Sequence, residues 1–212
     1  MQAEQHFAEL PLVAILRGLV PEQAIEVASA LYESGIRIIE VPLNSPEPVR
    51  SIQMLAGLSH LDWSIGAGTV LNVDDVERTL AAGGTIIISP NCNTEVIRRA
   101  LDRGLEPIPG VATATEACVA IDAGAHYLKL FPAITYGPAH LRALSAVLPS
   151  HIRVIPVGGI GAGDMADWIA AGAAGFGFGS ELFKPGYSLE DVAQRGRRLV
   201  GALREALGTD AP

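Results

Sequence analysis

Only two lysines occur among the 15 basic residues of this 212-residue chain, and one of them, Lys129, stands inside the apolar run 126–132. If this run is a strand, side chains alternate between its two faces, so Tyr127, Lys129 and Phe131 share the face opposite the two leucines. An ammonium held among apolar walls loses hydration, which lowers its pKa and makes the amine nucleophilic. This chemistry suits Schiff-base formation with a carbonyl. The simpler alternative is a structural ion pair or a lysine whose charged end reaches solvent.

A second ionisable side chain, Glu40, stands in the apolar run 36–43. Ile36, Ile38 and Glu40 share one parity, so we expect all three to point inward, with the carboxylate near the end of the strand. A carboxylate that flanks the same cavity as an amine can move protons during carbonyl chemistry. The alternative is a carboxylate neutralised by an interior arginine such as Arg17.

The elements that must position these residues form a repeating pattern. Eight short apolar runs that end in Gly, Pro, Asn or Ser are predicted as strands, at residues 13–17, 36–43, 63–70, 85–89, 106–111, 126–132, 153–158 and 175–179. Amphipathic segments between them are predicted as helices, at residues 22–34, 47–58, 73–82, 95–103, 115–123, 139–148, 164–171 and 189–207. Eight such units predict a single (β/α)8 TIM barrel over residues 1–212, in the α/β class, with an open doubly wound sheet as the alternative.

Glycine-rich turns follow the seventh and eighth predicted strands. They contain Val157, Gly158 and Gly159 after one strand, and Gly179 and Ser180 after the other. Barrels frequently bind phosphate at these two loops, because glycines let backbone N–H groups approach the anion and a short helix adds its dipole. Each glycine pair alone is common turn chemistry. Their joint position predicts a phosphate site.

Two other polar residues are expected inside the barrel, Arg17 at the end of the first strand and Thr69 at the end of the third. A guanidinium can hold a carboxylate through two parallel hydrogen bonds. The five histidines have no metal-ligand spacing, so they are interpreted as surface or structural residues and no metal is predicted.

Composition restricts the partners. The formal net charge of −8 repels nucleic-acid phosphates and anionic membranes, so neither is expected as a partner. A phosphorylated small molecule therefore needs a local binding device. The two cysteines form no paired motif, which is typical of a reduced intracellular chain, and the N-terminus resembles no signal peptide. We expect a cytoplasmic protein.

Taken together, these segments resemble the class I aldolases that cleave 2-keto-3-deoxy-6-phospho sugar acids, the gluconate and galactonate enzymes. The resemblance runs from Val13 to Leu199. Its motifs are AILRG, IIEVPLNSP, IGAGTVL, SPN, PGVATATEA, YLKLFPA, VGGI and FGFGS. The resemblance implies a (β/α)8 barrel, a homotrimer, no cofactor and no metal. It also implies reversible cleavage of a sugar-acid phosphate to pyruvate and glyceraldehyde 3-phosphate.

The resemblance also implies roles for individual residues. Lys129 matches the Schiff-base lysine and Glu40 the proton shuttle. Arg17 and Thr69 match positions that contact the keto-acid end or the hydroxyls, and Phe131 is expected to wall the pyruvyl side. The phosphate positions are matched by Gly158, Gly159, Gly179 and Ser180.

Two positions favour the galactonate branch of that family. Gluconate enzymes carry a motif resembling EVTLR on the second strand and a Thr before the glycine pair, whereas this chain has Asn44 and Val157 there. A valine cannot hydrogen-bond the carbon-four hydroxyl, so the preference for one epimer is lost. The alternatives are the gluconate epimer as main substrate, a non-catalytic sugar-phosphate-binding barrel, and an isomerase that uses a carboxylate base.

Overall fold

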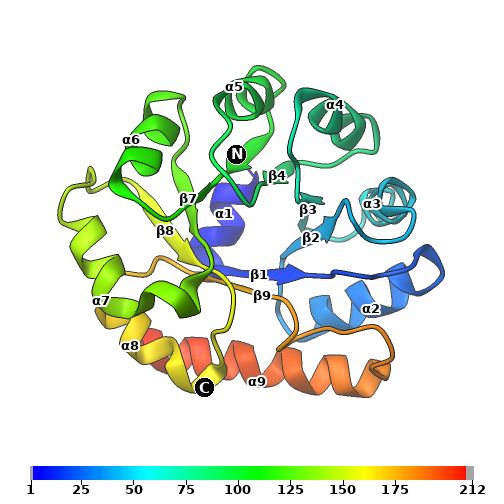
Figure 1. The fold of residues 1–212 in the computed structure, drawn as a ribbon. Helices are drawn as coiled ribbons and strands as arrows, with labels where there is room; N and C mark the ends of the chain where they lie inside the picture. The colour runs from blue at the N-terminus through cyan, green and yellow to red at the C-terminus, as the bar shows by residue number, and fades with distance from the viewer. Residues whose placement is uncertain (1, 209–212) are drawn as a thin grey trace.

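The computed structural model describes residues 2–208, and they form a (β/α)8 barrel (Figure 1). The strands are β1 Leu12–Ile15, β2 Ile38–Pro42, β3 Ser64–Gly68, β4 Ile86–Ile88, β5 Glu106–Ile108, β6 Gly110–Val111, β7 Tyr127–Leu130, β8 Arg153–Pro156 and β9 Phe176–Phe178. The helices are α1 Gln2–Glu9, α2 Pro21–Glu33, α3 Pro48–Ala56, α4 Val73–Ala81, α5 Thr94–Asp102, α6 Ala114–Asp122, α7 Ala133–Ser145, α8 Met165–Ala170 and α9 Leu189–Leu207, with the short 3-10 helix η1 Ala162–Asp164 before α8.

All strand pairs are parallel, and the strands form a ring. Six strands pair in the order β5-β4-β3-β2-β1-β9 and three in the order β6-β7-β8. Pro109 separates β5 from β6, which together are the single strand predicted at 106–111. A bridge between Val157 and Gly177 joins β8 to β9 and closes the ring. The predicted barrel is therefore confirmed.

Two layers of apolar side chains fill the molecule. The larger lies between the strands and the surrounding helices, and it includes Leu128 and Leu130 of β7. The smaller contains inward-pointing residues of the strands, among them Ile38, Tyr127 and Val157. The parity predicted for β7 is thus correct. The parity predicted for Ile36 is wrong: this residue precedes β2, packs in the outer layer, and does not share the inner face with Ile38.

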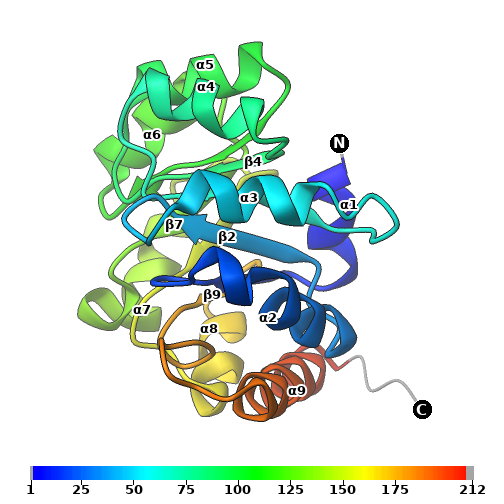
Figure 2. The ribbon, with the colours of Figure 1, turned by 90° about the vertical axis from the view of Figure 1, so that its right-hand side faces the viewer.

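Helix α1 covers the amino-terminal ends of the strands, at the end of the barrel away from the arrowhead of β2 (Figure 2). Phe7 stacks on Tyr127 with ring centroids 4.4 Å apart. His6 is buried, with Nδ1 2.9 Å from Ser64 Oγ and Nε2 3.1 Å from Asp62 Oδ1. This helix was not predicted from the sequence. Its histidine is structural, which agrees with the sequence interpretation.

The helix predicted at 139–148 begins earlier, at Ala133, and is kinked at Gly137, where φ is +75°. The Gly137-Pro138 pair interrupts the helical spacing, so the sequence did not predict the first turns of α7. Across residues 2–208, the helices are all too short or too polar to span a bilayer.

Candidate active site

A cavity of about 350 Å³ opens at the carboxyl-terminal ends of β1, β7, β8 and β9. This is the end of a barrel where active sites are found. Eight residues predicted for the site line it: Arg17, Lys129, Phe131, Val157, Gly158, Gly159, Gly179 and Ser180. Two others, Glu40 and Thr69, lie outside this lining.

Lys129 lies on the inner face of β7 and is 6% exposed, at the cavity wall. Its Nζ is 5.0 Å from the centroid of the Phe131 ring. Burial lowers the pKa of the Lys129 ammonium; the negative charge of Glu40 opposes that change, and the positive charge of Arg17 adds to it. The direction is the one expected for a nucleophilic amine.

Glu40 lies on β2 and is 1% exposed. Its Oε2 is buried and has no hydrogen-bond partner. Burial raises the pKa of this carboxyl, and the charges of Lys129 and Arg17 only partly oppose the shift. The sequence left open whether burial or the cations would dominate, and here burial dominates. A raised pKa on the carboxyl and a lowered pKa on the amine bring the two groups closer in acidity, which favours proton exchange between them.

Arg17 is exposed at the mouth of the cavity, where its Nη1 donates a hydrogen bond of 2.6 Å to Asn44 Oδ1. The amide therefore orients the guanidinium. The alternative in which Arg17 neutralises Glu40 through a direct ion pair is not the arrangement found, although its charge does lower the pKa of that carboxyl.

The glycine turn after β8 is joined by hydrogen bonds to the segment that follows Lys129. Ala133 N–H donates to Val157 O at 2.8 Å, and Ile134 N–H donates to Gly158 O at 3.0 Å. Gly158 and Gly159 have φ of +98° and +75°, which favours glycine at both positions. In the part of the chain that the structure describes, the N–H groups of Gly159, Ile160 and Ser180 donate to no protein group. They are available to an anion in the cavity.

Thr69 is half-buried, and its φ of +58° places a β-branched residue in the left-handed region. Such strain is kept only where the surrounding structure enforces it, which is typical of functional sites. Sequence reasoning missed six lining residues, Ile15, Ile160, Gly161, Gly177, Phe178 and Glu181. Most lie within or beside predicted strand ends, so the parity of β1 and β9 was the signal that could have found them.

Within residues 2–208, no three His, Cys, Asp or Glu side chains are grouped so that they could hold a metal ion. The cavity and its surroundings supply an amine, a neighbouring carboxyl and unpartnered backbone N–H groups.

Comparison with known proteins points to one family. The family model for KDPG and KHG aldolase matches residues 3–195. The chain is 45% identical over 199 residues to 2-dehydro-3-deoxy-6-phosphogalactonate aldolase of Escherichia coli K12, covering 94% of this chain and 97% of that protein.

Solved structures agree with this result. The structure of native KDPGal superposes with a TM-score of 0.93 at 45% identity, covering 94% of this chain and 97% of that chain. KDPG aldolase from Legionella pneumophila, solved with pyruvate captured as a covalent carbinolamine intermediate, superposes with a TM-score of 0.81 at 26% identity and covers 100% and 99% of the two chains.

Proposed function

This chain belongs to the KDPG and KHG aldolase family, and from that membership and the geometry of the cavity we propose that it reversibly cleaves 2-dehydro-3-deoxy-6-phosphogalactonate to pyruvate and glyceraldehyde 3-phosphate. The observation that carries the proposal is Lys129, an inward-pointing lysine with a lowered pKa in the wall of the cavity. A captured carbinolamine in the Legionella relative supports amine chemistry on a keto acid in this family.

The reaction begins when the neutral amine of Lys129 attacks the carbon-two ketone and forms a carbinolamine. Loss of water produces an iminium, which accepts the electron pair of the carbon three–carbon four bond as that bond breaks. The carbon-four hydroxyl loses its proton, and glyceraldehyde 3-phosphate leaves. The resulting enamine takes up a proton at carbon three, and water then releases pyruvate and restores the amine.

Glu40 moves the protons in this sequence, directly or through a water. It donates a proton when the carbinolamine loses water, accepts the carbon-four hydroxyl proton, and returns a proton to the enamine. These roles require a carboxyl that gains and loses a proton near neutral pH. Burial of Glu40, which raises its pKa, supports that requirement.

The remaining residues orient the substrate. The backbone N–H groups of the two glycine turns bind the distal phosphate, Arg17 and Thr69 contact the carboxylate or hydroxyls, and Phe131 walls the pyruvyl side. Binding at the phosphate fixes the reacting bond relative to Lys129. Because the anion is held by backbone groups, a protein with a net charge of −8 can bind a phosphorylated acid.

The test is reduction of the protein with borohydride in the presence of pyruvate, followed by intact-mass and peptide analysis. We expect one pyruvyl adduct on Lys129, and none on Lys129→Ala. Lys184→Ala is the matched control, because Lys184 is the other lysine and is exposed. It should label and turn over like the unaltered protein. Labelling that persists in Lys129→Ala, or turnover by that variant, would overturn the Schiff-base mechanism.

The resemblance implies a homotrimer, and we extend the proposal to that assembly. Exposed apolar side chains, among them Ile134 and Tyr136, support an interface between copies of the chain. Light scattering on the purified chain should give three times the mass of 22.2 kDa, and a monomeric mass would contradict it.

A further inference from the structure

The inner face of β3 carries almost no side-chain volume. Ser64, Gly66 and Gly68 share this face by alternation, and Ser64 is engaged with His6 at the far end of the barrel. In the register of the sheet, Glu40 of the neighbouring strand lies opposite Gly66, and Pro42 lies opposite Gly68. The long side chain of Glu40 therefore has open space on the adjoining strand to enter.

The two glycines face different neighbours. A Cβ built on Gly66 would overlap the backbone carbonyl of Ile86, so glycine is needed there for the strands to approach. A Cβ built on Gly68 would overlap the carboxylate of Glu40, and its three nearest atoms are Oε2, Cδ and Oε1 of that group. The three atoms nearest to this Cβ all belong to the end of one side chain, and none belongs to the backbone.

We propose that Gly68 is the positioning residue for Glu40, because the volume left by its missing side chain is the place where the catalytic carboxylate sits. This inference rests on the role proposed for Glu40. The carboxylate fills the inner face of β3 with Oε2 buried and without a partner. A methyl group at position 68 leaves the backbone in place and displaces the carboxylate.

The consequence is a loss in catalysis without a loss of fold. Displacement of a reacting group by about 1 Å can cost about 100-fold in rate. Gly68→Ala should therefore lower kcat by about 100-fold and change KM far less, since the glycine turns and Arg17 are untouched. A displaced carboxyl regains hydration, so the limb of the kcat–pH profile that it governs should move to lower pH.

The decisive experiment is rescue in the double variant. Glu40→Asp shortens the side chain by one methylene and makes room for the methyl of Gly68→Ala, so the double variant should be more active than Gly68→Ala alone. Gly201→Ala is the matched control, because a Cβ there meets nothing within 4 Å. Circular dichroism and thermal unfolding of each variant report the fold. Wild-type kcat in Gly68→Ala, or a loss that Glu40→Asp does not relieve, would overturn the proposal.

Glu40→Gln in the unaltered background separates this inference from the proposed function. If Glu40→Gln is inactive and Gly68→Ala is fully active, the positioning role is wrong while the role of Glu40 stands. If Glu40→Gln retains full activity, the role of Glu40 in the proposed function is wrong, and the positioning role falls with it.

Discussion

Within residues 2–208, each end of the barrel buries one carboxyl group, and the stronger neighbouring charge has the opposite sign at the two ends. Glu40, at the carboxyl-terminal ends of the strands, is 1% exposed and lies within the fields of Lys129 and Arg17. Glu106, at the amino-terminal end of β5, is 3% exposed and lies within the field of Glu4 from α1. In each carboxyl one oxygen is buried without a hydrogen-bond partner, Oε2 of Glu40 and Oε1 of Glu106.

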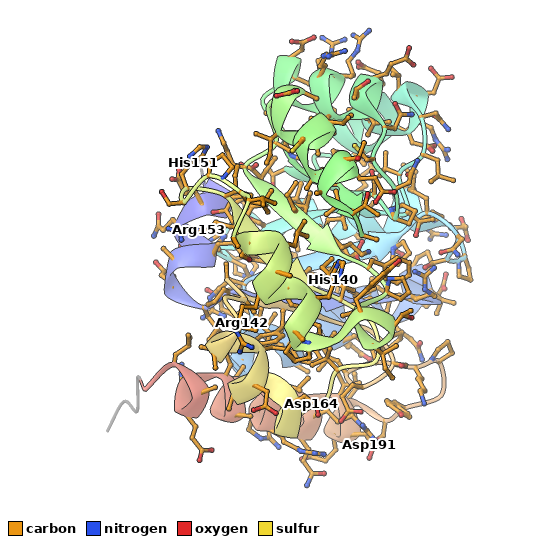
Figure 3. All side chains as sticks on the ribbon, turned by 60° about the vertical axis from the view of Figure 1, so that its left-hand side comes forward. His140, Arg142, His151, Arg153, Asp164 and Asp191 are labelled. Atoms are coloured by element: carbon orange, nitrogen blue, oxygen red, sulfur yellow. The ribbon has the colours of Figure 1, made fainter. Side chains whose placement is uncertain are left out.

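Glu106, the carboxyl at the amino-terminal ends of the strands, shows what burial does when the stronger neighbouring charge is negative. Burial, together with the charge of Glu4, raises the pKa of Glu106 to about 7. Burial and the charge of Glu106 raise the pKa of Tyr127 to about 12. A second cavity, of about 320 Å³, lies at this end between α1, Tyr127 and Arg153, and Arg153 is seen beside α1 in Figure 3. Its lining contains no lysine.

Burial alone does not distinguish Glu40 from Glu106, whereas the groups around them do. A buried carboxyl with a raised pKa is present at both ends, but of the two cavities only the one at the carboxyl-terminal ends of the strands is lined by a lysine. A raised pKa therefore marks two candidates, and their surroundings favour Glu40 as the one proposed to act in catalysis.

The largest expected difference is in turnover. Glu40→Gln should lower kcat by roughly 10²–10⁴-fold, because it removes general acid–base catalysis. Glu106→Gln should leave kcat unchanged, because Glu106 lies at the opposite end of the barrel. Steady-state assays of both variants at one pH make the comparison. Similar losses in the two variants would mean that Glu40 acts through the fold and not on the substrate.

The second difference is in stability. The folded protein keeps the Glu106 proton up to a pH of about 7, whereas the unfolded chain releases it near 4.5. The unfolded state therefore binds fewer protons between these values, so the stability due to this group is present at low pH and is lost as pH rises towards 7. Glu106→Gln removes the titration.

The free energy of unfolding of Glu106→Gln, taken relative to that of the unaltered protein, should rise by on the order of 3 kcal/mol when the pH is raised from 4.5 to 8. Urea unfolding at both pH values measures this gain. Glu26→Gln, a change at an exposed position of α2, is the control and should show no such difference. A gain independent of pH would show that packing, and not ionisation, distinguishes the two side chains.

The smallest expected effect concerns the choice of epimer. Val157 lines the same cavity as Lys129 and is 6% exposed. Val157→Thr adds a hydroxyl that can bond the carbon-four hydroxyl of the gluconate epimer, so the kcat/KM ratio should move towards that epimer by about tenfold. Val157→Ala shortens the side chain without adding a donor and should leave the ratio unchanged. An equal shift in both variants would assign the effect to space in the cavity.

Local patterns were sufficient to predict the barrel and much of the site. Alternation placed Lys129 inside and the two neighbouring leucines outside, because period-two spacing holds along any strand. Five glycines that follow helical segments have φ between +73° and +104°: Gly35, Gly83, Gly104, Gly124 and Gly172. The resemblance to the aldolase family is confirmed. The individual residue roles stay predictions.

Contacts between distant segments were beyond such patterns. Helix α1 packs on the barrel through Phe7, which stacks on Tyr127. No pattern in the sequence near residue 7 predicts that contact. The seating of Glu40 on Gly68 depends on how two strands pair, which a single strand does not encode. The raised pKa of Glu40 depends on the balance between burial and two charges, so it required the folded arrangement.

The packing of α1 has a consequence for synthesis of the chain on the ribosome. Phe7 is made before Tyr127, which lies 120 positions later, and β9, which pairs with β1, comes later still. At a translation rate of about 5–20 residues per second, the wait for Tyr127 lasts roughly 6–24 s. The apolar face of α1 is therefore made well before the residue on which it packs. For that time Phe7 lacks the Tyr127 ring as its stacking partner.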